Sequence, residues 1–168
     1  MSITRANAAA LMTLVAAATI AGAWGFELIG GFIPCKLCLQ ERIPYYVGLP
    51  LAVAALGTAV AGMAERTTRL LLAAAALVFL VGAGLGVYHA GVEYGWWLGP
   101  ADCGPGAASE TRSTDALLAQ LDTIRVVSCS EASWRFPPQW GLSFAGWNAA
   151  IATLLTLVGL AGALRRSA

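Results

Sequence analysis

The stretch PCKLCLQER, residues 34–42, is a short polar segment between two long apolar runs. Each of these runs reaches the roughly 20 residues that a helix needs to cross a bilayer, and two more such runs follow. The four runs lie at about 8–33, 43–63, 70–92 and 142–164. Irregular backbone cannot face lipid, so we predict a bundle of four transmembrane helices with loops at about 34–42 and 93–141.

The composition supports an all-α membrane protein. Of the 168 residues, 58% are hydrophobic and 11% are charged, and the mean hydropathy is +0.71. A soluble domain usually has about a quarter of its residues charged. We predict one integral membrane domain over 1–168 that contacts the lipid bilayer. The net charge of +1 gives no basic field, so we predict no nucleic-acid partner.

Positive charges near the helix ends predict the orientation. Five cations fall on the side of the termini (Arg5, Arg66, Arg69, Arg165 and Arg166) and five on the other side (Lys36, Arg42, Arg112, Arg125 and Arg135). Arg112 and Arg125 lie deep in the long loop, where a charge has less influence on orientation. We therefore predict that both termini are cytoplasmic and that all four cysteines are periplasmic, where disulfides persist.

The N-terminus also has features of a signal peptide. Arg5 precedes an apolar stretch, and AGA at 21–23 resembles a cleavage site. Cleavage would leave three helices. Because the apolar run continues beyond that site, we favour an uncleaved first helix.

The long loop contains one amphipathic segment. Its apolar residues, Leu117, Leu118, Leu121 and Ile124, share one face of a short helix. We predict that this helix lies in the membrane interface; an ordinary loop helix packed on its neighbours is the alternative.

Cys35 and Cys38 form a C-x-x-C motif directly before the second predicted helix. A helix start favours a thiolate, and Arg42 follows Cys38 by four residues, so the two share a helical face. This makes Cys38 the better-placed thiolate. A haem attachment site is excluded because Leu39 stands where C-x-x-C-H requires histidine.

Three other uses of the cysteines compete. Cys103 and Cys129 are able to complete a zinc site with the C-x-x-C pair, but their spacing is a poor match to zinc motifs. A structural disulfide within C-x-x-C is also open, although this tight ring suits exchange better. Alone, Cys103 and Cys129 favour a structural disulfide that closes the loop. Beside an outward-facing C-x-x-C, they favour a relay of two exchanging pairs.

These features resemble the DsbB family of bacterial inner-membrane proteins that generate disulfides. The resemblance rests on PCKLCLQER after the first helix, YHAGVEYGWW at 88–97, the two loop cysteines, and GLSFAGWNA at 141–149. It covers nearly the whole chain. The segment FPPQWGL at 136–142 departs from the pattern as a small insertion, which leaves the cysteines unchanged.

The resemblance implies a path for electrons. A reduced periplasmic DsbA-like thioredoxin-fold oxidase attacks Cys103 of a Cys103–Cys129 disulfide, and the released Cys129 pairs with Cys35. Cys38 is then freed as a thiolate beside ubiquinone, or alternatively menaquinone, from the membrane quinone pool.

Arg42, His89 and Cys38 form the predicted quinone site. Arg42 is assigned to it because it faces Cys38 and is able to bond a quinone oxygen; an interfacial anchor or a partner of Glu41 is the alternative. The resemblance implies that His89 lines the quinone pocket or supplies protons, although a lone histidine near a helix end is as often a packing residue. Glu27, Glu41 and Glu93 are candidates for a proton path.

Two other functions remain open. A vitamin K epoxide reductase-like enzyme also has four helices, cysteine pairs and a quinone, but its C-x-x-C belongs at the start of the last helix. A non-catalytic four-helix membrane protein with structural disulfides is the second alternative.

Overall fold

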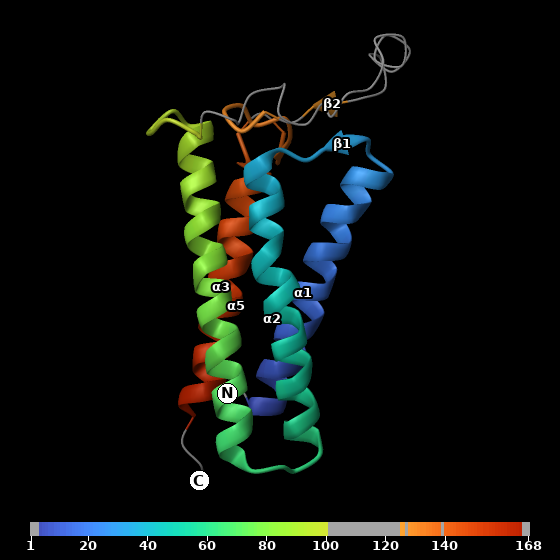
Figure 1. Cartoon of the computed structure of the whole chain (residues 1–168), viewed down its shortest axis with the longest axis vertical. Coiled ribbons are helices and arrows are strands. Elements are labelled where there is room, and N and C mark those ends of the chain that lie inside the picture. Colours follow the sequence, from blue (N-terminus) through green and yellow to red (C-terminus); the bar gives the residue numbers. More distant parts are fainter. Residues whose placement is uncertain (1–3, 101–124, 127, 139, 166–168) are drawn as a thin grey trace.

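Four long helices make up most of the chain in the computed structural model, which describes residues 4–100, 125–126, 128–138 and 140–165. The helices are α1 (Arg5–Leu28), α2 (Lys36–Val60), α3 (Glu65–Glu93) and α5 (Phe144–Leu164). They run up and down, and both termini lie at the same end of the bundle (Figure 1). All four are long and apolar enough to cross a membrane, so the predicted four-helix fold is confirmed.

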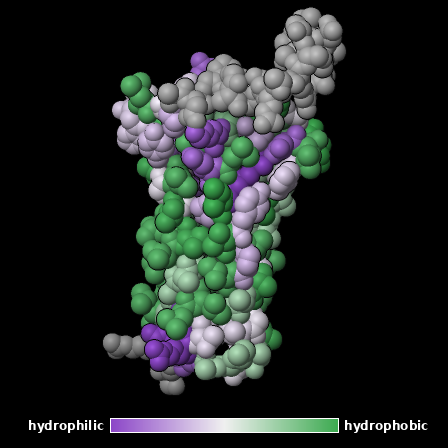
Figure 2. All heavy atoms as spheres, in the orientation of Figure 1, coloured by the Kyte–Doolittle hydropathy of each residue, from purple (hydrophilic) through white to green (hydrophobic). Residues whose placement is uncertain are grey.

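The outer surface of the bundle is apolar over its middle. Large side chains such as Leu14, Val60, Leu77 and Leu164 are each more than half exposed. On the face drawn in Figure 2, hydrophobic residues form a broad band between more polar ends. An exposed apolar surface of this extent is expected to contact lipid. The protein is therefore a multi-pass membrane protein.

Small residues allow the helices to approach closely in the core. Phe79, Met12 and Leu72 are fully buried there. Where α3 crosses α5, a Cβ atom on Gly86 would lie 2.7 Å from the backbone nitrogen of Ala149. This contact leaves no room for a side chain, which is typical of packing between membrane helices.

The ends of α1 and α2 differ from the prediction. Helix α1 stops at Leu28 rather than near residue 33, because the chain turns through Gly31 at a φ of 69° into strand β1 (Phe32–Ile33). Helix α2 begins at Lys36 rather than near residue 43. The segment 36–42 is thus helical and not a loop, and Pro44 lies inside the helix.

Two short strand pairs involve residues of the long loop between α3 and α5. Strand β1 pairs in parallel with β2 (Arg125–Val126), while β3 (Arg135–Phe136) pairs antiparallel with β4 (Leu142–Ser143). The first pairing holds the loop beside the start of α2. The second makes the segment 136–142 part of a hairpin before α5. The predicted interfacial helix at 117–124 lies outside the described residues.

Polar contacts gather at the end of the bundle that carries the termini. Arg5 forms an ion pair with Glu65 and also donates to the carbonyl of Arg165. Nε of Arg69 donates to the carbonyl oxygen of Ala163 over 3.0 Å. Cations predicted to flank the helix ends on the terminal side are therefore grouped together. The compartment that this end faces stays a prediction.

Candidate functional site

The two C-x-x-C cysteines lie at the first turn of α2. Cys35 is the N-cap residue, and its sulfur accepts a hydrogen bond of 3.1 Å from the backbone N–H of Cys38. Both are free thiols, with Cys35 buried and Cys38 partly exposed. Because the helix starts at Lys36, the N–H of Cys38 has no carbonyl partner within the helix, and the Cys35 sulfur takes that place.

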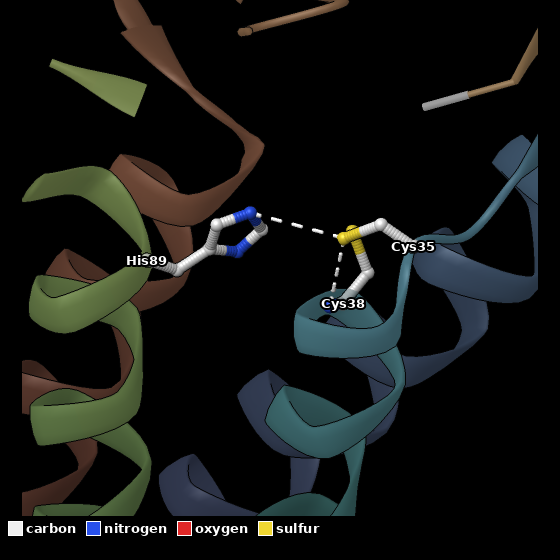
Figure 3. Close-up of side chains that lie close together, drawn as sticks. All are labelled: Cys35, Cys38 and His89. Carbon is white, nitrogen blue, oxygen red and sulfur yellow. Dashed lines mark hydrogen bonds between the residues drawn. The ribbon is translucent and has the colours of Figure 1, made fainter. Parts of the chain in front are cut away.

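A buried histidine contacts the Cys35 sulfur, and a buried carboxylate contacts that histidine. Nε2 of His89, from α3, lies 3.8 Å from the Cys35 sulfur (Figure 3). Its other ring nitrogen, Nδ1, lies 2.9 Å from Oε1 of Glu41 in α2. His89 and Glu41 are both buried. The carboxylate fixes the orientation of the ring, so Nε2 faces the sulfur and is able to exchange a proton with it.

These contacts make Cys35 the thiolate of the reduced pair. The Cys38 thiol donates to the Cys35 sulfur and lowers its pKa most strongly; burial opposes this, and the hydrogen bond with His89 lowers the pKa further, to about 5. The prediction that Cys38 is the better-placed thiolate is therefore wrong for this state. The helix begins seven residues earlier than expected, at Lys36 rather than 43, so Cys35 and not Cys38 takes the capping position.

Cys129 lies in the same buried cluster. It packs with Cys35, Leu37 and Val92 and has no exposed surface. Cys129 is disulfide-bonded, whereas the predicted site residue Cys103 lies outside the described residues. The parallel pairing of β1 with β2 explains this placement, because Cys35 and Cys129 each follow their strand by a few residues. A cysteine from the loop thus lies beside the C-x-x-C pair.

A cavity of about 300 Å³ opens next to Cys38. It lies between α1, α2, α5 and strand β3. Its aromatic lining is Phe26, Phe32, Tyr45, Trp134, Phe136, Phe144 and Trp147. Trp134 stacks on Phe144 with ring centroids 4.6 Å apart. Cys38 and Arg42 both border this cavity, as the predicted quinone site requires, but His89 is not among its described lining residues. His89 lies instead on the Cys35 side of the pair.

Arg42 connects α2 to α1 across one wall of the cavity. Its guanidinium forms an ion pair with Glu27 and donates over 3.4 Å to the carbonyl of Ala23. It also lies 5.3 Å from the ring centre of Trp24. Arg42 and Cys38, which the sequence predicted to share a helical face, therefore line the same cavity. The hydrogen bonds of the guanidinium are made to α1.

One polar group at the cavity lacks a partner. Oδ1 of Asn148 accepts a 2.8 Å hydrogen bond from the Tyr45 hydroxyl, and both residues line the cavity. Nδ2 of Asn148 is buried and has no hydrogen-bond partner among the residues that the structure describes. A buried amide N–H without an acceptor is costly, so this group is available to an acceptor in the cavity.

The three candidate proton-path carboxylates have separate positions. Glu41 contacts His89, and Glu27 contacts Arg42. Glu93 accepts a hydrogen bond from Ser143, the N-cap residue of α5. Sequence reasoning missed the individual pairings, because residues far apart in the chain form them. The signal that the sequence did offer for these contacts was the position of Glu27 and Glu41 at the ends of apolar runs.

Comparisons with known proteins agree with this arrangement. The model of the family "Disulfide bond formation protein DsbB" matches residues 5–162. A curated relative, disulfide bond formation protein B of Marinobacter nauticus, is 34% identical over an alignment of 170 positions that covers 93% of this chain and 90% of the relative. No solved structure matches the chain. With its C-x-x-C pair at the start of the second of four membrane helices, the chain belongs to the DsbB family of disulfide bond formation proteins.

Proposed function

We propose that this protein reoxidises a periplasmic DsbA-like thioredoxin-fold oxidase and passes the electrons to quinone in the bacterial inner membrane. The proposal rests on one observation: three cysteines and a cavity lie next to one another in order. Cys129 packs against Cys35, the Cys35 sulfur accepts a hydrogen bond from the backbone N–H of Cys38, and Cys38 borders an aromatic cavity that opens beside the membrane helices.

Electrons enter by thiol–disulfide exchange at the loop pair. A thiolate of the reduced partner attacks Cys103 of the Cys103–Cys129 disulfide, and Cys129 leaves as a thiolate. Attack at Cys103 is favoured because Cys129 has no exposed surface and a protein partner cannot reach it. The second thiol of the partner then displaces Cys103, so the partner leaves as a disulfide and the loop pair is reduced.

The second exchange takes place within the buried cluster. The Cys129 thiolate attacks Cys35 of an oxidised Cys35–Cys38 pair, and Cys38 leaves as a thiolate beside the cavity. Attack by Cys103 on Cys129 restores the loop disulfide and releases Cys35. The two electrons of the partner then reside on the reduced Cys35–Cys38 pair.

His89 and Glu41 hold and move the proton of Cys35. Nε2 of His89 faces the sulfur that must leave as a thiolate, and Glu41 holds the opposite ring nitrogen. The ring is therefore positioned to stabilise the Cys35 thiolate when it is displaced from Cys129. His89 acts on Cys35 and not at the cavity in this proposal.

The residues around the cavity suit a quinone ring. The aromatic walls match a flat, apolar group, the unpaired Asn148 N–H offers a donor to a carbonyl oxygen, and Arg42 adds a positive charge. A bound quinone accepts two electrons and two protons. Cys38 is the nearest sulfur to this space, and its place on the cavity wall allows it to deliver the electron pair. The same chemistry suits ubiquinone or menaquinone.

The test uses the purified protein in detergent with a reduced DsbA-like partner. We expect the partner to be oxidised only when quinone is supplied, and we expect Cys103→Ser and Cys129→Ser to abolish that reaction. In both variants, dithiothreitol should still reduce the Cys35–Cys38 pair, and quinone should still reoxidise it. Normal oxidation of the partner by Cys103→Ser, or no electron transfer to quinone by the unaltered protein, would overturn the proposal. The second result would favour a protein with structural disulfides.

A further inference from the structure

We propose that the reduced C-x-x-C pair and His89 form a binding site for one Zn²⁺ ion, and that this site is abolished when the pair is oxidised. The ligand atoms are the sulfurs of Cys35 and Cys38 and Nε2 of His89, which all lie within 4.8 Å of one another. Cys35 and His89 are buried, and Cys38 is partly exposed. In the sequence, zinc is considered only with Cys103 and Cys129 as the additional ligands, and it is not favoured because their spacing fits zinc motifs poorly.

The distances fit tetrahedral zinc. With Zn–S near 2.3 Å and Zn–N near 2.0–2.1 Å, neighbouring sulfur and nitrogen ligands lie about 3.6 Å apart, and two sulfurs about 3.8 Å apart. The Cys35 sulfur and Nε2 of His89 are 3.8 Å apart. These two ligand atoms are thus close to the spacing that zinc requires, and the Cys38 sulfur lies within 4.8 Å of both. Three protein ligands leave a fourth position for water.

Glu41 supplies the support that zinc-binding histidines usually have. A metal at Nε2 requires the proton of the ring to be on Nδ1, and a carboxylate acceptor fixes that tautomer. Oε1 of Glu41 lies 2.9 Å from Nδ1. Two thiolates also neutralise the charge of the ion itself. Binding releases the proton of the Cys38 thiol and any proton on Nε2 of His89, while the proton on Nδ1 stays toward Glu41.

Zinc at this site has a redox consequence that rests on the proposed function. A disulfide between Cys35 and Cys38 leaves no thiolate to bind the metal, so only the reduced protein is a target. Bound zinc holds both sulfurs, and neither is then free to deliver electrons or to pair with Cys129. We therefore expect Zn²⁺ to trap the protein in its reduced form.

The experiment measures metal binding directly, in detergent, without partner or quinone. Reduced protein, freed of reductant, is titrated with Zn²⁺ in competition with a chromophoric chelator, and with Co²⁺ to record thiolate-to-metal absorption. We expect one ion per reduced chain and at least tenfold weaker binding by protein oxidised at Cys35–Cys38. His89→Gln should lose at least tenfold in affinity, and Glu41→Gln about 10–100-fold.

Cys129→Ser is the matched control, because it removes a neighbouring sulfur that the site does not use. We expect it to bind Zn²⁺ as the unaltered protein does, and far-ultraviolet circular dichroism should show that every variant is folded. The proposal is wrong if reduced protein binds no metal, if His89→Gln binds as tightly as the unaltered protein, or if Cys129→Ser loses as much as Cys38→Ser. Because no step of this assay requires quinone, its failure is distinct from failure of the proposed function.

Discussion

The low pKa of Cys35 leads to a measurable difference between two pH titrations. In the reduced protein the Cys38 thiol and His89 lower this pKa from 9.0 to about 5. At pH 7 the thiolate fraction of Cys35 is then about 99%, whereas a thiol with a pKa of 9 would be about 1% ionised. The proton is lost as the pH rises through the lowered pKa, so the thiolate forms about four pH units earlier than in an ordinary cysteine.

Replacing His89 by Gln should raise that pKa without restoring the ordinary value. The substitution removes the contact to Nε2 and its charge, but the hydrogen bond from Cys38, which has the largest effect, is retained. The midpoint should therefore lie between about 5 and 9. The assay is the ultraviolet absorbance of thiolate in reduced protein as a function of pH, which needs no reagent to reach the buried sulfur.

Cys35→Ser serves as the control for this titration, because the early step that belongs to Cys35 must be absent from its curve. Only the unaltered protein and His89→Gln should show that step. A midpoint near 9 in the unaltered protein would refute the reasoning about Cys35. An identical midpoint in His89→Gln would show that the histidine does not act on this sulfur.

Three other predictions concern orientation, packing and the cavity. A reporter fused after Ala168 should be cytoplasmic and one inserted near Ala108 periplasmic; the opposite result for the second would remove the oxidising compartment. Gly86→Ala should destabilise the folded bundle by about 1–3 kcal/mol, because its Cβ would meet α5, whereas Gly84→Ala, with nothing within 4 Å, should leave the thermal unfolding midpoint unchanged or raised. Arg42→Lys should raise the quinone concentration needed for turnover while reduction of the loop disulfide continues; unchanged quinone dependence would limit Arg42 to an anchoring role.

The four helices were predictable because crossing a bilayer requires length and hydropathy, which a sequence displays directly. The start of α2 was not, because the polar residues at 36–42 have the composition of a loop. They are helical because Cys35 caps the first turn and because Glu41 and Arg42 are buried against protein instead of lipid. Hydropathy does not distinguish a polar residue in a loop from one paired with another helix.

The cysteines and Arg42 were predicted as site residues, but the contacts between them were not. His89 lies 54 positions from Cys35, so no local pattern connects them. The resemblance placed His89 with the quinone, whereas the structure places it beside Cys35. Asn148 gave no signal in the sequence at all, since a single amide in an apolar helix is able to face lipid, a neighbouring helix or a cavity. Only the assembled bundle shows which of these occurs.

The unpaired amide of Asn148 provides the sharpest test of the cavity. Asn148→Leu keeps the volume of the side chain but removes the donor, so a quinone should lose one hydrogen bond worth about 0.5–1.5 kcal/mol, or about 2–12-fold in affinity. The readout is quenching of tryptophan fluorescence by a quinone without its isoprenoid tail, because Trp134 and Trp147 line the cavity. Tyr45→Phe is the matched control: it removes the hydroxyl that donates to Oδ1 and leaves the amide nitrogen in place, so its effect should be the smaller. If Asn148→Leu binds the quinone as tightly as the unaltered protein, the orphaned N–H does not point to the ligand. The cavity would then hold the ring through its aromatic walls and Arg42 alone.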